Sequence, residues 1–412
     1  MYELEYRLEE CLQDLSTNEL GIILLGLFRA RSRIKSCKLV SDIIDKVLNN
    51  IDGIESIYLA SIFKTLRLSV FMQLLPQYKE LLTAVLPHLP RLSIMCVTQV
   101  SHLAAKLVHY DKEWLTVIVE RFNNELPNLR LKDIERNNYA VASLCPDDEF
   151  KTTHLNVIQE LLSTYKTTRQ SEIEAFPAEV PTILAHLSFK NIYSEELLKF
   201  SFSPNYMDKL FGRNLYKLTR EFWILDYNVR IDLPSYTGPF LQDHYIQYMT
   251  KKFFIARKSE WCENKSRQFI TEFVHIAKTN LNLPVCTDEV LPQYCMPDIL
   301  FGLDETNNVI SVEPILSQMP YGTIKRVSDR DDLKDIKFMA VVIIRPNNLI
   351  ARTDQINNFT KAKIRHLEKI GYTPLAFWET EWSAFETEES KAKLIKDLMF
   401  SKQNLGTFSL KQ

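Results

Sequence analysis

The sequence predicts an α-helical repeat solenoid followed by a C-terminal α/β domain. Helical patterns recur in pairs from about residue 15 to residue 165, with a spacing typical of stacked repeats. Short runs rich in β-branched residues, which are typical of strands, appear only in the last third of the chain. The low content of nine glycines in 412 residues also suits helices better than glycine-rich phosphate loops.

The N-terminal part is predicted to contain four helix pairs. The first helices start roughly 37 to 40 residues apart, as in known helical repeats, and read NELGIILLGLFRAR, ESIYLASIFKTLRLS, LSIMCVTQVSHLAAKL and DIERNNYAVASL. The second helices read KLVSDIIDKVLNNI, QYKELLTAVLPHL, EWLTVIVERFNNEL and THLNVIQELLSTY. One pair cannot bury its apolar face alone, so we expect neighbouring pairs to stack.

A solenoid of this kind serves either as a protein-interaction scaffold or as a reader of RNA. Solenoids that read RNA present basic and polar side chains on successive helices. The residues of that kind here are Arg31, Arg33, Lys35, Lys38, Lys64, Arg67, Arg136, Asn137 and Asn138. Sequence alone does not place them on one face, so both alternatives stay open.

Prolines and composition divide the chain into four regions. We expect a helical-repeat region over 1–165 and a further helical region over 166–241, which ends in the turn LPSYTGPF. An α/β region over 242–400 and a short tail over 401–412 follow.

The α/β region is predicted from alternating strand and helix patterns. The expected strands are VISVEPI, KFMAVVIIRP and YTPLAFWETEW, and the expected helices are DQINNFTKAKIRHLEKIG and ETEESKAKLIKDLMF. In the first helix, apolar residues recur mostly at three- and four-residue spacing, which gives one buried stripe. Gly371 follows at a position where a helix end needs a positive φ. The order strand, helix, strand favours a parallel pair.

The most basic stretch is HYIQYMTKKFFIARKSEWCENKSRQFITEFVHIAK, within residues 240–280. Its cations are Lys251, Lys252, Arg257, Lys258, Lys265 and Arg267, and they are interleaved with Phe253, Phe254 and Trp261. Cations that neutralise phosphates, next to aromatic faces that stack on bases, suit single-stranded RNA. The alternative is an amphipathic helix with its aromatic side chains in the core.

Two stretches resemble one known family. FTKAKIRHLEKIGYTPLAFWETEWSAF, within residues 338–396, resembles the RAP domain, an RNA-associated module at the C-terminus of the FAST kinase domain-containing family of mitochondrial proteins. LDYNVRIDLPSYTGPFL, residues 225–241, is similar to a second signature of the same family.

The resemblance implies a function and a set of contact residues. It implies an RNA-binding regulator that controls the stability, processing or translation of mitochondrial transcripts, in the mitochondrial matrix. Its partners would be single-stranded mitochondrial transcripts and RNA-processing proteins. Lys361, Lys363 and Arg365 occupy positions that are basic in RAP domains, and Trp382 is either a base-stacking platform or a core residue. The N-terminal MYELEYRLEE is acidic, unlike an Arg-rich mitochondrial presequence.

The element order from residue 265 onward also resembles the PD-(D/E)xK nuclease core. In that core two acids bind a divalent metal and a lysine orients water. Asp298 and Glu313 match the acids, whereas Ile315 stands at the lysine position, which Lys325 or Lys337 would have to supply. We therefore expect a vestigial site that needs no cofactor. A nuclease that uses Mg²⁺ at Asp298 and Glu313 is the rival hypothesis.

Other motifs and the composition exclude several classes. The chain contains no GxGxxG, HRD or DFG motif, so kinase chemistry is not expected. Seven cysteines without CxxC spacing indicate reduced thiols rather than zinc ligands. The formal net charge of −2 means that RNA binding would need local basic patches. No apolar run is long enough to span a membrane.

Overall fold

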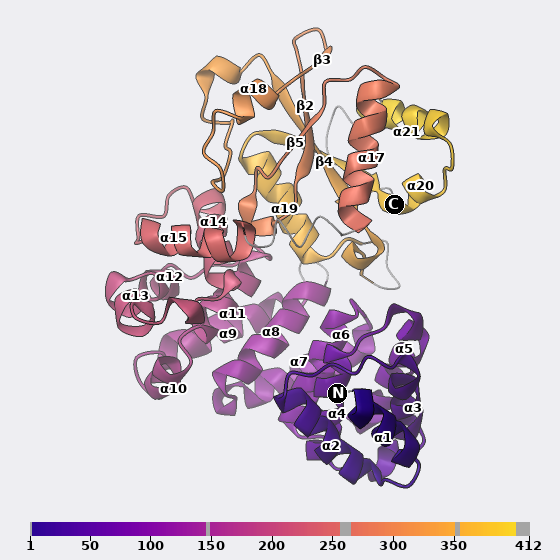
Figure 1. Ribbon diagram of the computed structural model, residues 1–412. Helices are drawn as coiled ribbons and strands as arrows, with labels where there is room; N and C mark the ends of the chain where they lie inside the picture. The colour runs from indigo at the N-terminus through magenta and orange to yellow at the C-terminus, as the bar shows by residue number, and fades with distance from the viewer. Residues whose placement is uncertain (1, 146–148, 256–264, 351–354, 401–412) are drawn as a thin grey trace. The chain divides into compact units, whose positions relative to one another are not determined.

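The computed structural model describes residues 2–145, 149–255, 265–350 and 355–400. The chain divides into two compact units, Met1–Ala175 and most of the sequence from Phe176 onward. The first unit is all helical, and the second adds a mixed sheet to further helices (Figure 1). Helical repeats followed by an α/β domain confirm the predicted fold class.

The first unit contains the four predicted helix pairs. The first helices of the pairs are α2 (Thr17–Arg29), α4 (Ser56–Leu68), α6 (Ile94–Lys106) and α8 (Leu131–Leu144). The second helices are α3 (Cys37–Leu48), α5 (Leu75–Val85), α7 (Lys112–Glu125) and α9 (Lys151–Thr164). The short helices α1 (Tyr2–Cys11) and α10 (Gln170–Ala175) lie at its two ends.

Stacking of the first helices builds the core of this unit. α2 packs on α4, α4 on α6 and α6 on α8, around one continuous apolar cluster. Gly21 allows the close approach of α2 and α4, because a Cβ at this position would lie 2.6 Å from the Cβ of Tyr58. Ser16 and Glu19 close a capping box that starts α2. The expectation that neighbouring pairs stack is confirmed.

The helices that open the second unit lead into the α/β part. They are α11 (Glu179–Ser188), α12 (Glu195–Ser201), α13 (Pro204–Phe211), α14 (Arg220–Asp232) and α15 (Asp243–Met249). A π-helical turn over Thr250–Ile255 continues α15. The helices of the α/β part are α17 (Lys265–Thr279), α18 (Glu313–Leu316), α19 (Asn358–Lys369), α20 (Glu379–Ser383) and α21 (Glu388–Phe400).

The sheet has the order β1-β2-β4-β5, and β3 also pairs with β2. Its strands are β1 (Cys286–Asp288), β2 (Asp298–Leu303), β3 (Val309–Ile310), β4 (Lys337–Ile344) and β5 (Tyr372–Trp378). The predicted parallel pair is confirmed as β4 and β5, joined by α19, and the other pairs are antiparallel. One apolar cluster lies between the sheet and α19, and a second lies between the sheet and α17 and α21. Figure 1 shows α17 and α21 together on one side.

Several predicted elements differ from the observed ones. VISVEPI is not one strand, because β3 ends at Ile310 and Glu313 starts α18. The strand YTPLAFWETEW ends at Trp378, after which α20 begins. β1 was not predicted, because its three residues, Cys-Thr-Asp, carry no apolar run. Gly371 follows α19 with φ +99°, as expected.

Candidate nucleic-acid interface and its supporting polar cluster

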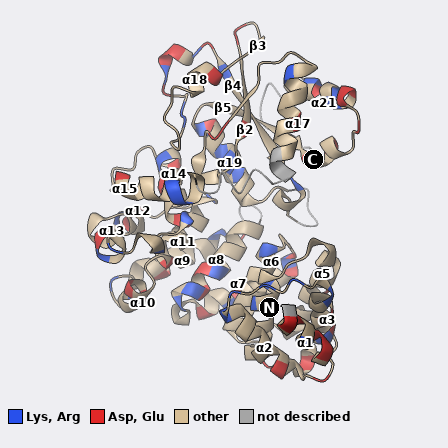
Figure 2. Ribbon diagram, in the orientation of Figure 1, with Lys and Arg blue, Asp and Glu red and all other residues tan. Residues whose placement is uncertain are grey.

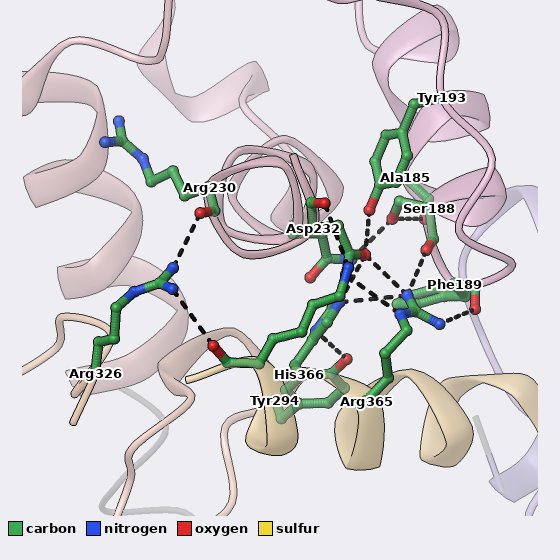
Figure 3. Close-up of polar contacts among 12 residues, drawn as sticks. Ala185, Ser188, Phe189, Tyr193, Arg230, Asp232, Tyr294, Arg326, Arg365 and His366 are labelled. Carbon is green, nitrogen blue, oxygen red and sulfur yellow. Dashed lines mark hydrogen bonds and ion pairs between the residues drawn. The ribbon is translucent and has the colours of Figure 1, made fainter. Parts of the chain in front are cut away.

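The carboxylate of Asp232, the last residue of α14, gathers donors from α19. Its Oδ2 lies 2.9 Å from Arg365 Nη2 and 3.0 Å from His366 Nε2 (Figure 3). Its Oδ1 lies 2.9 Å from Lys369 Nζ. The Tyr193 hydroxyl donates a further bond of 2.6 Å to Oδ2. The side chain of Asp232 is fully buried. We call Asp232, Tyr193, Arg365, His366 and Lys369 the Asp232 cluster.

The Asp232 cluster is a neutral imidazole and two cations around one carboxylate. Burial would raise the pKa of Asp232, but the hydrogen bonds and charges of His366 and Arg365 outweigh burial and hold this pKa far below its ordinary value. Burial lowers the pKa of His366, although Asp232 opposes that effect. We assign a neutral imidazole that donates from Nε2 to Asp232 and accepts at Nδ1 from the Tyr294 hydroxyl, 2.9 Å away.

Arg365 extends the contact to the helices that open this unit. Its Nη2 donates to the Ser188 carbonyl at 3.0 Å and its Nη1 to the Phe189 carbonyl at 3.3 Å (Figure 3). Both carbonyls stand at the C-terminal end of α11, where helix carbonyls have no intrahelical partners and attract cations. Arg365 therefore fastens α19 to α11 and α14.

Asp226, the other acid of the stretch 225–241, also has a structural role. Asp226 is fully buried, pairs with Arg230 at 2.6 Å and accepts a 2.9 Å bond from the Leu241 backbone N–H. The Arg230 guanidinium lies 4.2 Å from the centre of the Phe240 ring. These contacts fix the LPSYTGPF turn against α14. The two stretches that carried the family resemblance thus meet at α14 and α19 and build one packing unit.

Two of the three basic residues of α19 that were expected to contact RNA, Lys363 and Arg365, form ion pairs with carboxylates. Lys363 was expected to reach phosphates from an exposed face, but its side chain is 12% exposed and its Nζ lies 2.5 Å from Asp298 Oδ1. Arg365, named as a further RNA contact, belongs to the Asp232 cluster. Lys361 is partly exposed. The expectation that both lysines reach phosphates from an exposed face is therefore wrong for Lys363.

The basic stretch 251–267 is only partly described. Lys251 is exposed on the π-helical turn, whereas Lys252 Nζ donates to the carbonyls of Tyr216 (2.9 Å) and Leu218 (3.1 Å). Phe254, expected beside them, is buried. Arg257, Lys258 and Trp261 lie outside the residues that the structure describes. Lys265 and Arg267 lie on α17, but their side chains are not among those described.

Trp382 lies in the core. Its side chain is 4% exposed, and its ring stacks on Phe273 and lies edge-on to Phe269 and Phe377. Its Nε1 donates to Glu272 Oε2 at 2.9 Å. Of the two alternatives for Trp382, the core residue is the observed one, so it offers no platform for a base.

The two acids of the expected vestigial site lie in different surroundings. Asp298 is buried at the start of β2 against Lys363, whereas Glu313 is exposed at the start of α18. β1 pairs with β2, and Asp288 of β1 stands opposite Asp298 of β2. β1 thereby occupies the part of β2 with which a longer β3 would have to pair. Among the described residues, no group of three His, Cys, Asp or Glu side chains is arranged to hold a metal ion.

Lys325, which the rival hypothesis offered as a substitute lysine, pairs with Asp288 rather than with Asp298 or Glu313. Lys325 is buried, and its Nζ lies 2.6 Å from Asp288 Oδ2 and donates to the Leu316 carbonyl at 2.9 Å. Burial raises the pKa of Asp298, and the charge of Lys363 opposes that effect. An ammonium group is therefore paired with each of the two adjacent strand aspartates, Lys325 with Asp288 and Lys363 with Asp298.

Sequence reasoning named Arg365 only as an RNA contact, and it missed Asp288 and the other members of the Asp232 cluster, which are Tyr193, Asp232, His366 and Lys369. The only available signal for Asp232 was its place in the stretch 225–241, at an acidic position of the family signature. In the solenoid, Asn137 and Asn138 are buried, so they do not read bases; Asn137 Nδ2 donates to Thr98 Oγ1 at 2.8 Å. Among the described helices, none has the length and apolar character to cross a bilayer.

Comparison with known proteins supports the resemblance. No family model matches the chain. The chain is similar to the proteins named FAST kinase domain-containing protein 5, mitochondrial: it is 23% identical to that of Macaca fascicularis and 22% identical to those of Homo sapiens and Mus musculus. Each match covers 74% of this chain and 39% of the relative, so the chain spans well under half of the length of these relatives.

All of these relatives are named as mitochondrial, which supports the expected location. The matched share of the chain, together with the two signature stretches that meet at the Asp232 cluster, supports the resemblance of this chain to the FAST kinase domain-containing family.

Proposed function

We propose that this protein binds single-stranded RNA and acts after transcription on mitochondrial transcripts, at the level of their stability, processing or translation. The observation that carries the proposal is the union of the two family signatures in one folding unit. Asp232 of the stretch 225–241 binds Arg365, His366 and Lys369 of the RAP-like stretch. The chain therefore contains an assembled form of the module for which the resemblance implies an RNA role.

Binding is favoured over cleavage by the placement of the acids. A metal-dependent nuclease needs two acids that converge on one metal ion. Here Asp298 is buried against Lys363 and Glu313 is exposed on α18. Moving Lys363 away would leave Asp298 as an uncompensated buried charge, which is costly. The nuclease alternative thus requires a rearrangement of this part of the fold.

The proposal is tested by crosslinking in intact mitochondria. Cells that express the tagged full chain are irradiated with ultraviolet light, and the RNA that is covalently attached to the purified protein is sequenced. The expected result is enrichment of mitochondrial transcripts over cytosolic transcripts, with crosslinks in single-stranded segments. Recovery of no more RNA than from an unirradiated sample would overturn the proposal and favour a protein-interaction scaffold.

A further inference from the structure

Three half-buried cations of the first unit gather on the first helices of the repeats. Lys64 and Arg67 lie on α4, and Arg136 lies on α8. Burial lowers the pKa of both Lys64 and Arg67, and the positive charge of Arg136 lowers each of them further. α4 and α8 both pack on α6, and the electrostatic effects between them indicate that the three cations lie near one another although they are far apart in sequence. We call Lys64, Arg67 and Arg136 the repeat cation cluster.

Aromatic groups lie beside the repeat cation cluster. Lys64, His102 and Tyr139 stand at equivalent positions of their helices, each eight residues after the first residue of α4, α6 and α8. Arg67 Nη1 lies 3.2 Å from His102 Nε2, and the rings of His102 and Tyr139 meet edge-on at 5.8 Å. The repeat therefore aligns cations and rings across three successive helices.

No carboxylate forms an ion pair with these three cations in the described part of the chain, although the charge of Asp133 raises the pKa of Lys64 and that of Glu135 raises the pKa of Arg67. The nearby acids have other partners, since Asp133 accepts two bonds from Arg130 and Glu135 pairs with Lys132 at 3.1 Å. α8 contains residues of both charge signs (Figure 2), and its two acids, Asp133 and Glu135, are buried and already have partners.

Two other arginines of this unit, the buried Arg169 and the partly buried Arg121, behave differently. Arg169 is bound by Glu160 at 2.9 Å, by Glu172 and by the Leu129 carbonyl at 2.6 Å. Arg121 is bound by Glu125 at 2.7 Å and by backbone carbonyls of the preceding repeat. These arginines hold the repeats together through complementary acceptors. The repeat cation cluster lacks such carboxylate and carbonyl acceptors, so repulsion between its positive charges destabilises the fold. Because packing of the repeats does not need these charges, they are better explained by a binding role.

We propose that the repeat cation cluster binds the phosphodiester backbone of single-stranded RNA, with Tyr139 and His102 beside the flanking base. This inference rests on the proposed function and assigns part of the RNA contact to the first unit. Phosphate oxygens would supply the acceptors that Lys64, Arg67 and Arg136 lack, because arginine forks and lysine ammonium groups both bind phosphate. The ring edges and faces at Tyr139 and His102 suit an unstacked base.

The test compares two full-length variants that each lose three positive charges. The first is Lys64→Gln, Arg67→Gln and Arg136→Gln. The matched control is Lys46→Gln, Lys79→Gln and Lys151→Gln, which removes cations from the second helices α3, α5 and α9. Fluorescence anisotropy with a labelled mixed-sequence 20-nucleotide RNA measures affinity over a salt series.

The expected result follows from counterion release. Three lost phosphate contacts should reduce the slope of log K against log salt by about 2 and weaken binding about 100-fold at 0.1 M salt, since each contact contributes a slope of about 0.7. Lys64→Gln alone should weaken binding about fivefold under the same conditions. Arg67→Lys with Arg136→Lys keeps the charges and should keep the slope. The control variant should bind within about twofold of the wild type.

Stability separates a binding role from a structural one. If the cations serve RNA, their neutralisation relieves repulsion, so the triple variant should unfold at the same or a higher temperature than wild type. An RNA affinity of the triple variant equal to that of the control would overturn the inference while leaving the proposed function intact. Unchanged RNA affinity with lost binding of poly-glutamate would assign the cluster to an acidic protein instead. A wild type that binds no RNA would remove both proposals.

Discussion

Replacement of Asp232 by asparagine is the sharpest structural test of how the second unit is held together. The substitution keeps the size of the side chain and removes the charge that Arg365 and Lys369 share. An amide also turns an N–H₂ group toward donors such as the Tyr193 hydroxyl. Removal of one partner from a buried ion pair costs about 3–5 kcal/mol of unfolding free energy.

The assay is urea unfolding followed by circular dichroism, together with a thermal scan. For a unit of this size, a loss of about 3–5 kcal/mol lowers the unfolding temperature by roughly 6–20 °C. Asp331→Asn is the matched control, because its carboxylate is 92% exposed and its pair with Lys334 is worth at most about 1 kcal/mol. If Asp232→Asn costs no more than Asp331→Asn, the Asp232 cluster does not hold α14 to α19.

Three further predictions concern the second unit. Gly371→Ala should destabilise the protein by about 1–3 kcal/mol in the same unfolding assay, because φ is +99° and the added Cβ would lie 2.6 Å from the Ser328 backbone nitrogen; an unchanged midpoint would refute this account of the turn. Lys363→Met should cost about 3–5 kcal/mol by stranding the Asp298 carboxylate. Adding Asp298→Leu to Lys363→Met should restore much of this loss, and a double variant worse than the single one would contradict the pairing. His366 predicts a pH dependence: since burial lowers its pKa in the folded state, the unfolded chain binds the proton first as pH falls below about 6.5. Wild-type stability should then fall by up to about 1.4 kcal/mol per pH unit more than that of His366→Gln, and parallel pH profiles would exclude a buried neutral imidazole.

Protonation of Asp232 should destabilise the protein in a separate and more acidic pH range. The folded-state pKa of Asp232 lies far below its ordinary value, so its contribution is complete above about pH 4 and is lost as pH falls further. The effect of His366 begins near pH 6.5, so the two contributions can be resolved in one titration.

Local pattern was enough to predict the elements around α19. The three- and four-residue spacing of its apolar residues, the glycine at 371 and the β-branched run before it each reflect a local preference that tertiary contacts did not override. The same holds for the four helix pairs, because each repeat carries its own amphipathic pattern. These features could be predicted because each depends on neighbours within a few turns of chain.

The candidate site could not be predicted in the same way. A basic residue on a helix reads as solvent-exposed unless its partner is known, and the partner of Arg365 lies 133 residues earlier in the chain. Lys363 is similarly hidden by a carboxylate on another element, Asp298. Glu313 lies in α18 and not in the expected strand, because the unpredicted β1 occupies the edge of β2 with which that strand would have paired. In each case a long-range pairing, invisible in local pattern, decided which side chains face solvent.

One experiment tests the central claim, that the chain binds RNA without cutting it. The full-length protein is mixed with an end-labelled pool of mitochondrial RNA in Mg²⁺ or in EDTA, and retention and fragment length are measured in the same samples across a salt series. The account predicts retained, full-length RNA in both conditions, with affinity that falls steeply with salt. Cleavage that requires Mg²⁺ and is abolished by Asp298→Ala would contradict it, as would the absence of any retained RNA.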